Sequence, residues 1–331
     1  MHRDVQELLT ALGIPEFEYT EVADAERWQG GGQRWPVLAS INRALIERTV
    51  SQVPPTSPLS YQRLHAAHCI GVASGHGGAG RSTVAANLTA ALAQAGRRAV
   101  ALDLDPLGTL GLHFGLDPQE PTGVFQTSIS QAAVASWMAR FRGGASVLPF
   151  GKLAAGLQTG LEATLVRDPF WLRKRLQMVV PGDCEFVVLD LPVASHPLFR
   201  AAAGLVDTML AVVTTEPPAY AALPRLEAML DDCFPAGGSR RVRYLLNKVD
   251  ARRDFDRALV ASLRGTRPDQ TLSFGLHWDS SVPIALANRR LLLQEAADSQ
   301  VAVELSALAE WVGGVAAATA KVPERSIALV S

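Results

Sequence analysis

The sequence predicts an α/β protein with a doubly wound, mostly parallel sheet flanked by helices, and two observations support this fold class. Most strand candidates are near-continuous apolar runs, the pattern of strands that are covered on both faces. These runs alternate with helical stretches, which is the order of repeated strand–helix units. The predicted strands are residues 69–74, 98–105, 145–150, 185–191, 208–215, 242–247 and 271–276. The predicted helices are residues 82–95, 128–141, 168–178, 219–232, 254–264 and 299–319.

The order of these elements places polar residues directly after several strands. The strand "CIGVAS" runs into a glycine-rich turn, and the helix that follows is closed by Gly96. The strand "RAVALDLD" ends in Asp103 and Asp105, and "EFVVLDL" carries Asp190 near its end. Residues 106–145 are harder to assign. Because open α/β sheets bind ligands at the carboxyl ends of their strands, we expect a site along this edge.

Four regions follow one another along the chain. Residues 1–46 form a short, partly helical segment, in which Val5, Leu8, Leu9 and Leu12 have the spacing of one helix face. Residues 47–68 are expected to be a Pro/Ser-rich linker, residues 69–320 the α/β domain and residues 321–331 a tail. Because forty-odd residues rarely bury enough surface to fold alone, we expect the first segment to dock on the larger domain.

Composition favours a cytoplasmic globular protein. Of 331 residues, 48% are hydrophobic and 19% charged, and the net charge of -1 provides no global attraction to nucleic acid or anionic membranes. The three cysteines are widely spaced, so a zinc site or a disulfide framework is not expected. No apolar run approaches membrane-spanning length, so we also expect no direct insertion into a membrane.

The glycine-rich turn "SGHGGAGRST" has the spacing of a phosphate-binding P-loop between a strand and a helix. Glycines let backbone amides converge on an anion, and the helix N-terminus adds a partial positive charge. The Ser82 hydroxyl would bind Mg²⁺, and Thr83 would reach the inner phosphates. Arg81 stands where a P-loop has lysine, and it offers a planar fork instead of a point charge. The alternative is a tight turn without a ligand, although four glycines in six residues carry an entropic cost that such a turn does not require.

Polar groups at other strand ends complete the expected site. Asp190 stands in the place of a Walker-B carboxylate, which holds Mg²⁺ through water. The stretch "LNKVD" supplies Asn247, Lys248 and Asp250 where a purine base would lie. Guanine stays open beside adenine, because Asp250 could pair with a guanine edge.

The block "GVASGHGGAGRSTVAANLTAALAQAGRRAVALDLDP" resembles the deviant-Walker ATPases of the MinD/ParA family. This resemblance implies a P-loop NTPase fold that binds ATP with Mg²⁺ and forms an ATP-sandwiched homodimer. It places Arg81 at the P-loop lysine and His76 at the signature lysine, which reaches the partner's phosphates. Asp105 takes the position that orients the attacking water, and Asn247 the position that contacts adenine.

The resemblance therefore defines a full set of site residues. Asp105 and His76 are the candidate catalytic residues, and Ser82 and Asp190 the candidate metal ligands. The nucleotide-binding residues are Gly75, His76, Gly77, Gly78, Ala79, Gly80, Arg81, Ser82, Thr83, Asn247 and Asp279. Both family lysines are replaced, so we expect the protein to bind the nucleotide but to hydrolyse it slowly or not at all.

Within the family, the altered glycine loop is similar to that of the cellulose-biosynthesis ATPases called BcsQ. The N-terminal stretch "DVQELLTALGIPEFEYTEV" with the later "RWPVLASI" resembles the short accompanying protein BcsR. These resemblances imply an assembly factor that is peripherally associated with an inner-membrane cellulose synthase complex and its cytosolic accessory proteins. Two alternatives stay open. One is a partitioning or polar-positioning ATPase of the ParA/MinD type, and the other is a scaffold with a vestigial loop.

Overall fold

The computed structural model describes residues 64, 66–118, 120–126, 134, 137, 145–153, 155–193, 196–234 and 242–320. Its centre is a six-stranded sheet in the order β3-β2-β4-β1-β5-β6, in which every neighbouring pair is parallel. The strands are β1 (His68–Ala73), β2 (Ala99–Asp103), β3 (Ala145–Leu148), β4 (Phe186–Asp190), β5 (Thr208–Thr214) and β6 (Val242–Asn247). The predicted doubly wound α/β fold is confirmed.

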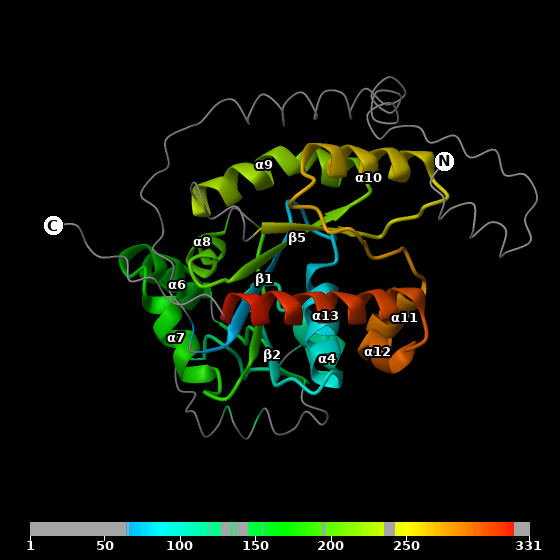
Figure 1. Ribbon diagram of the computed structural model, residues 1–331. Helices are drawn as coiled ribbons and strands as arrows, with labels where there is room; N and C mark the ends of the chain where they lie inside the picture. The colour runs from blue at the N-terminus through cyan, green and yellow to red at the C-terminus, as the bar shows by residue number, and fades with distance from the viewer. Residues whose placement is uncertain are drawn as a thin grey trace, which may run out of the picture.

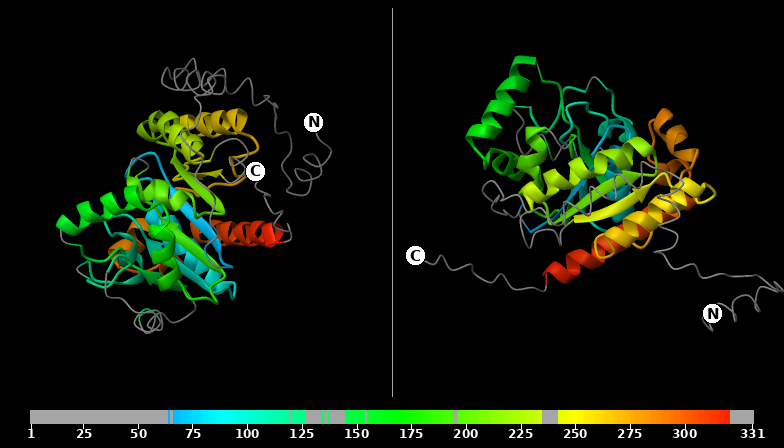
Figure 2. Two further views of the ribbon diagram at one scale, coloured as in Figure 1. Left: turned by 90° about the vertical axis from the view of Figure 1, so that its left-hand side faces the viewer. Right: turned by 90° about the horizontal axis from the view of Figure 1, so that it is seen from above.

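The strands are apolar throughout because helices cover the sheet on both faces. Every residue of β1, β2, β4 and β5 is buried. On one side, α4 (Arg81–Gln94) packs against the first four strands, and α12 (Leu292–Glu295) and α13 (Gln300–Ala320) pack on α4. On the other side lie α9 (Pro217–Cys233) and α10 (Asp254–Thr266) (Figures 1 and 2).

Shorter helices fill the remaining connections. They are the 3-10 helix η1 (Leu110–Phe114), α6 (Ala155–Arg167), α7 (Trp171–Val179), α8 (Pro197–Ala203) and α11 (Ser281–Ala287). The sequence prediction missed α6, α8 and α11, and it started α7 at residue 168, three residues too early. The predicted helix at 128–141 lies almost wholly outside the described residues.

The seventh predicted strand, residues 271–276, was wrong. This segment forms an isolated bridge to β6 between Tyr244 and Thr271, and a second bridge joins Val249 and His277. The Leu276 amide also donates a hydrogen bond to the Leu246 carbonyl of β6 at 2.8 Å. Between the bridges the chain comes so close to β6 that a Cβ on Gly275 would lie 3.1 Å from the Leu246 carbonyl oxygen. The segment thus lies directly against β6 without forming a seventh strand.

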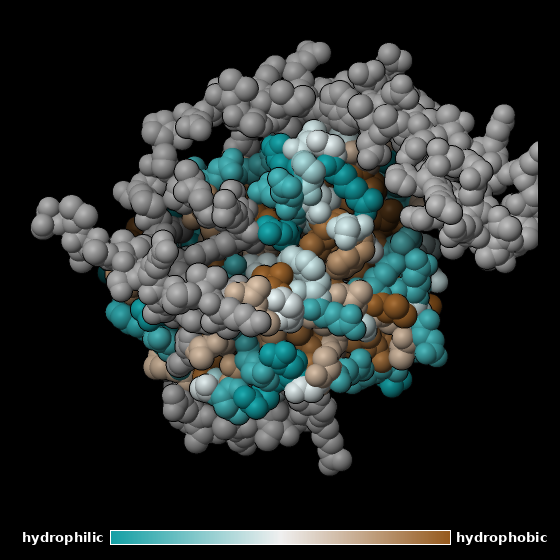
Figure 3. All heavy atoms as spheres, viewed as in Figure 1, coloured by the Kyte–Doolittle hydropathy of each residue, from teal (hydrophilic) through white to brown (hydrophobic). Residues whose placement is uncertain are grey.

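One helix among the described residues, α13, is long and apolar enough to cross a membrane by length and composition alone, which the sequence analysis did not expect. Core helices of globular proteins pass the same test, and α13 packs on α4 with Leu305, Leu308 and Val312 fully buried. The outer surface around α13 mixes hydrophobic and hydrophilic side chains (Figure 3).

Candidate nucleotide-binding site

The glycine loop joins the end of β1 to the start of α4, at the carboxyl edge of the sheet. Gly78 and Gly80 have φ angles of 77° and 90°, a left-handed conformation that glycine adopts without strain. A Cβ on Gly80 would lie 2.5 Å from the Asn247 side-chain nitrogen. No side chain caps the N-terminus of α4, so its first backbone amides remain available to an anion.

Arg81, the residue at the lysine position, is turned toward Asp105. Its Nη2 lies 2.9 Å from the Asp105 carboxylate, and both side chains are only 8% exposed. Within the described residues its Nη1 has no hydrogen-bond partner. The structure thus pairs the cation expected at the phosphates with the carboxylate expected to orient water.

Two more carboxylates stand side by side at the ends of β2 and β4, where Asp103 is in register with Asp190. Asp103 accepts hydrogen bonds from the backbone amides of Asp105 and Leu110, so it shapes the loop that carries Asp105. Burial, and secondarily the charge of Asp190, raise the pKa of Asp103 well above its usual value. Asp103 was noted in the sequence only as a polar strand end, because its role depends on where the chain turns afterwards.

Asp190 is fully buried, and within the described residues neither of its carboxylate oxygens has a hydrogen-bond partner. Burial raises its pKa to about 7, while the nearby Ser82 hydroxyl and Arg81 favour the ionised form. A buried carboxylate without a partner is costly unless an ion compensates it. Asp190 and Ser82 both offer oxygen atoms, which are the ligands that Mg²⁺ prefers, so these two residues fit a Mg²⁺ site.

Two residues that the sequence analysis missed contact the end of the glycine loop. The Ser82 hydroxyl lies 2.9 Å from that of Thr109, and the Thr83 hydroxyl lies 3.5 Å from Nε2 of His113. His113 is buried, and desolvation lowers its pKa to about 4, so it is neutral near pH 7. The signal for Thr109 was its place four residues after Asp105, on the same sheet edge.

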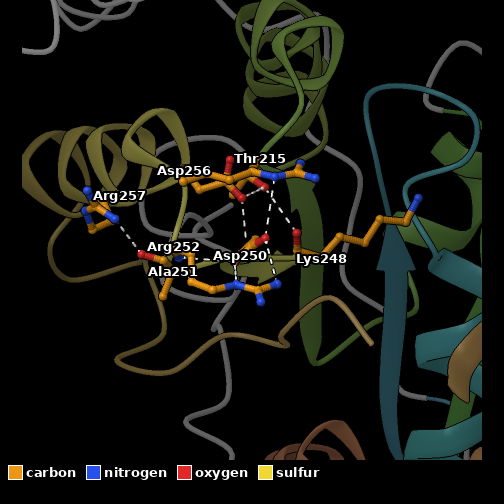
Figure 4. Close-up of polar contacts among 8 residues, drawn as sticks. Thr215, Lys248, Asp250, Ala251, Arg252, Asp256 and Arg257 are labelled. Carbon is orange, nitrogen blue, oxygen red and sulfur yellow. Dashed lines mark hydrogen bonds and ion pairs between the residues drawn. The ribbon is translucent and has the colours of Figure 1, made fainter. Parts of the chain in front are cut away.

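The last residue of β6 and the residue after it contact the glycine loop. Asn247 donates a hydrogen bond to the Ala79 carbonyl, and Lys248 donates one to the Gly78 carbonyl, both at 2.8 Å. Lys248 adopts a φ of 58°, which directs the chain away from the strand. Its long side chain extends toward the glycine loop in Figure 4. The end of β6 and the glycine loop are thereby joined by direct contacts.

The remaining predicted residues lie as follows. His76 is partly buried, with Nδ1 2.5 Å from the carbonyl oxygen of Gly77. Asp279 precedes α11 and accepts hydrogen bonds from the Ser281 amide and hydroxyl. It therefore organises the start of α11, and these contacts do not involve the glycine loop.

The fold and this loop define the class of protein. The sheet is parallel, a glycine loop joins β1 to α4, and carboxylates stand at the ends of β2 and β4. A protein with this arrangement is a P-loop ATPase of the MinD/ParA type. The family model for Cellulose biosynthesis protein BcsQ matches residues 68–312, so the chain belongs to the BcsQ family.

Several curated relatives are similar to the chain. BcsQ of Salmonella typhimurium is 23% identical over 246 residues, which cover 73% of this chain and 92% of that protein. The chromosome partitioning protein ParA of Myxococcus xanthus is 26% identical, over 57% of this chain and 68% of that protein. An uncharacterized ATP-binding protein of Methanocaldococcus jannaschii is 27% identical over 56% of this chain, and the match spans only 65% of its length.

Solved structures share the fold. The cell division ATPase MinD of Pyrococcus furiosus superposes with a TM-score of 0.55 at 21% identity, over 75% of this chain and 99% of that one. Cobyrinic acid a,c-diamide synthase of Mycobacterium smegmatis, solved with an ATP analog and magnesium, has a TM-score of 0.55 at 19% identity. That match covers 75% of this chain and 97% of the synthase.

Proposed function

We propose that this chain is an ATP- and Mg²⁺-binding assembly factor of a bacterial cellulose biosynthesis and secretion complex, with slow or absent hydrolysis. Membership of the BcsQ family supports the cellulose role. The buried ion pair between Arg81 and Asp105 is the observation that supports slow hydrolysis. The protein acts in the cytoplasm, at the inner face of the membrane that holds the synthase.

Different residues of the chain have different binding roles at this site. The loop Gly75–Thr83 holds the phosphates with backbone amides and the N-terminus of α4. Ser82 and Asp190 hold Mg²⁺, which when bound neutralises charge on the phosphate oxygens. Asn247 and Asp279 border the base, and His76 faces the phosphates of a second copy in a nucleotide-sandwiched homodimer.

Hydrolysis is slow because the two groups that would accelerate it, Arg81 and Asp105, are paired with each other. Phosphoryl transfer is catalysed mainly by positioning and by stabilising negative charge. Nη2 of Arg81 lies 2.9 Å from Asp105, so its charge is directed at that carboxylate. Asp105 in turn is held by Arg81 and by the Leu107 amide at 3.0 Å, so it is not free to orient a water molecule.

Calorimetric titration with ATP and Mg²⁺ tests binding. Gly80→Val should abolish the heat of binding, because its side chain would enter the space beside Asn247 where a Cβ already lies 2.5 Å away. Gly182→Val is the control, since a Cβ on Gly182 meets no atom within 4 Å and the residue precedes β4, toward the amino ends of the strands. Equal ATP affinity in Gly80→Val and wild type would show that the site is misassigned.

Phosphate release under single-turnover and steady-state conditions tests the hydrolysis proposal. The double variant His76→Lys/Arg81→Lys should turn over faster than wild type, by about tenfold or more, since charge-stabilising groups at such sites contribute factors of that size. Rapid turnover by the wild-type protein would contradict the proposal.

The similarity to ParA of Myxococcus xanthus supports the alternative role, that of a partitioning ATPase. Removing the gene from its own bacterium and measuring cellulose output separates the two roles. We expect cellulose to fall and to be restored by the wild-type gene. Unchanged cellulose, together with ATP-dependent retardation of duplex DNA by the purified protein, would support partitioning instead.

The proposed domain organisation keeps residues 1–46 as a BcsR-like segment, 47–68 as a linker, 69–320 as the nucleotide-binding domain and 321–331 as a tail. The first strand begins at His68, one residue before the proposed boundary, and the family match begins there too. The BcsR-like segment and the tail lie outside the described residues.

A further inference from the structure

The loop after β6 is held rigidly beside the glycine loop. Asp256 on α10 is buried, and its Oδ2 accepts hydrogen bonds from the Thr215 hydroxyl at 2.7 Å and from the Asp250 amide at 2.8 Å. The Thr215 hydroxyl oxygen also lies 3.2 Å from the Lys248 carbonyl oxygen (Figure 4). Lys248 is anchored at its other end by the Gly78 carbonyl. The backbone of residues 248–250 therefore has a fixed position next to the phosphate-binding loop.

Within this fixed loop, the Asp250 carboxylate is covered by arginine. Arg252 donates from Nε to Oδ1 at 2.9 Å and from Nη2 to Oδ2 at 3.2 Å, a two-pronged pair, and its backbone amide adds a third bond at 3.1 Å. Nε of Arg253 lies 3.5 Å from Oδ2. Arg252 is 85% exposed while Asp250 is 14% exposed, so the guanidinium lies between the carboxylate and the solvent (Figure 4). Its hydrogen bonds lower the pKa of Asp250.

The two purines differ at the edge that such a group would read. Guanine presents two adjacent N–H donors, at N1 and at the exocyclic N2, and a free carboxylate accepts both. Adenine presents an acceptor at N1, which a free carboxylate repels and a guanidinium donor suits. A site built to hydrogen-bond one of these patterns discriminates strongly against the other.

We propose that Arg252 sets the base preference of this site by masking Asp250, so that the loop accepts adenine and rejects guanine. This inference rests on the proposed nucleotide-binding function. Arg252 is thus a specificity-determining residue. Asp250 carries a carboxylate that would accept hydrogen bonds from guanine, and Arg252 occupies its two oxygens. The loop itself needs no rearrangement to change preference, because Asp256 and Lys248 hold its backbone independently of Arg252.

The test uses the full chain with Mg²⁺ and the probes ADP and GDP, titrated by calorimetry against four variants. Arg252→Gln unmasks the carboxylate, Asp250→Asn removes its charge, and the double variant does both. Arg98→Gln is the control for the loss of an exposed arginine charge, because Arg98 is 62% exposed and pairs with Asp183. It directly precedes β2, at the amino ends of the strands and away from the glycine loop. Thermal melting of each variant confirms that it is folded.

We expect wild type and Arg98→Gln to bind ADP more tightly than GDP. Arg252→Gln should shift the ratio of the two affinities toward GDP by about tenfold, the size of one charge-assisted hydrogen bond gained. The double variant should lose that gain, since its carboxylate is absent. A folded Arg252→Gln with the wild-type ratio would overturn the inference, as would a wild-type preference for GDP, and both would leave nucleotide binding standing. Binding of neither nucleotide by wild type would overturn the proposed function, and this inference with it.

Discussion

Arg81 shows how one side chain changes the chemistry of a loop. A lysine at this position would act as a point charge on a flexible stem, whereas Arg81 forms a buried pair with Asp105 at 2.9 Å. Taking away one partner of a buried ion pair typically costs about 3–5 kcal/mol, because the other charge is left uncompensated. Replacing Arg81 or Asp105 alone is therefore expected to destabilise the loop, and in the proposed function the same pair limits hydrolysis. Since Nη1 of Arg81 has no partner among the described residues, a bound phosphate would supply one.

His113 provides a residue-scale prediction about pH. Its pKa is about 4 when folded, because it is desolvated beside Thr83, and 6.5 in its unperturbed form. The unfolded state therefore binds a proton to His113 more readily than the folded state does. The contribution of His113 to folding stability is fully present above pH 6.5 and is lost as the pH falls toward 4. We expect the free energy of unfolding to drop by about 2 kcal/mol from this group alone between pH 8 and pH 5.

Urea unfolding of wild type and His113→Gln across that range measures this effect. The wild-type stability should fall more steeply than that of the variant, and the difference between the two slopes isolates the histidine. Parallel curves would contradict the assignment of a neutral, buried imidazole at this position.

At the scale of elements, α13 serves the core of the domain. It lies across α4, and α4 carries the glycine loop at its N-terminus, so the packing of α13 supports the position of the site. Its apolar composition follows from this burial, with Leu308 fully buried and Val303, on the outer face, 61% exposed. Glu304 of the same helix pairs with His277, which ties α13 to the segment after β6.

A pair of alanine variants tests this role. Leu308→Ala should lower the free energy of unfolding by about 2–5 kcal/mol, because it leaves a cavity in the core. Val303→Ala should change it by less than about 0.5 kcal/mol, as is usual for exposed sites. The midpoints of urea denaturation give both values. Equal, small effects would mean that α13 does not pack on the domain in solution.

At the scale of the whole molecule, the chain combines a nucleotide-binding domain with an N-terminal segment that we expect to dock on it. That segment holds Leu8, Leu9, Leu12, Trp35 and Leu38, which is too apolar for a free tail. The proposed linker of about 20 residues would maintain a high local concentration of the segment near its own domain or a dimer mate.

Deleting residues 1–46 should therefore lower the melting temperature and the solubility, and a separate peptide of those residues should restore both. Burial of the leucine and tryptophan side chains would contribute several kcal/mol before ordering costs, at about 25 cal/mol per Å². A truncated protein of unchanged stability, combined with unprotected amides at residues 5–45 in the full chain, would show that the segment is a free tail.

The sequence by itself determined the parallel sheet and the position of the glycine loop between β1 and α4. Strands buried on both faces must be apolar along their whole length, so β1, β2, β4 and β5 were readable from local composition. The glycine loop was readable because phosphate-binding loops need glycines at set spacings between a strand and a helix. Asp105, Asp190 and Asn247 followed from their positions at strand ends.

Only the tertiary structure decided which of these groups meet. Arg81 pairs with Asp105 across 24 positions, Lys248 reaches Gly78 across 170, and Arg252 covers Asp250 within one turn. Asp279 accepts hydrogen bonds from Ser281 at the start of α11, and the segment at 271–276 bridges β6 without forming a strand of the sheet. Local patterns record how a residue fits its own element, whereas these partnerships depend on where loops return after leaving the sheet. That path is set by the packing of the whole domain, and the chemistry of this site follows from it.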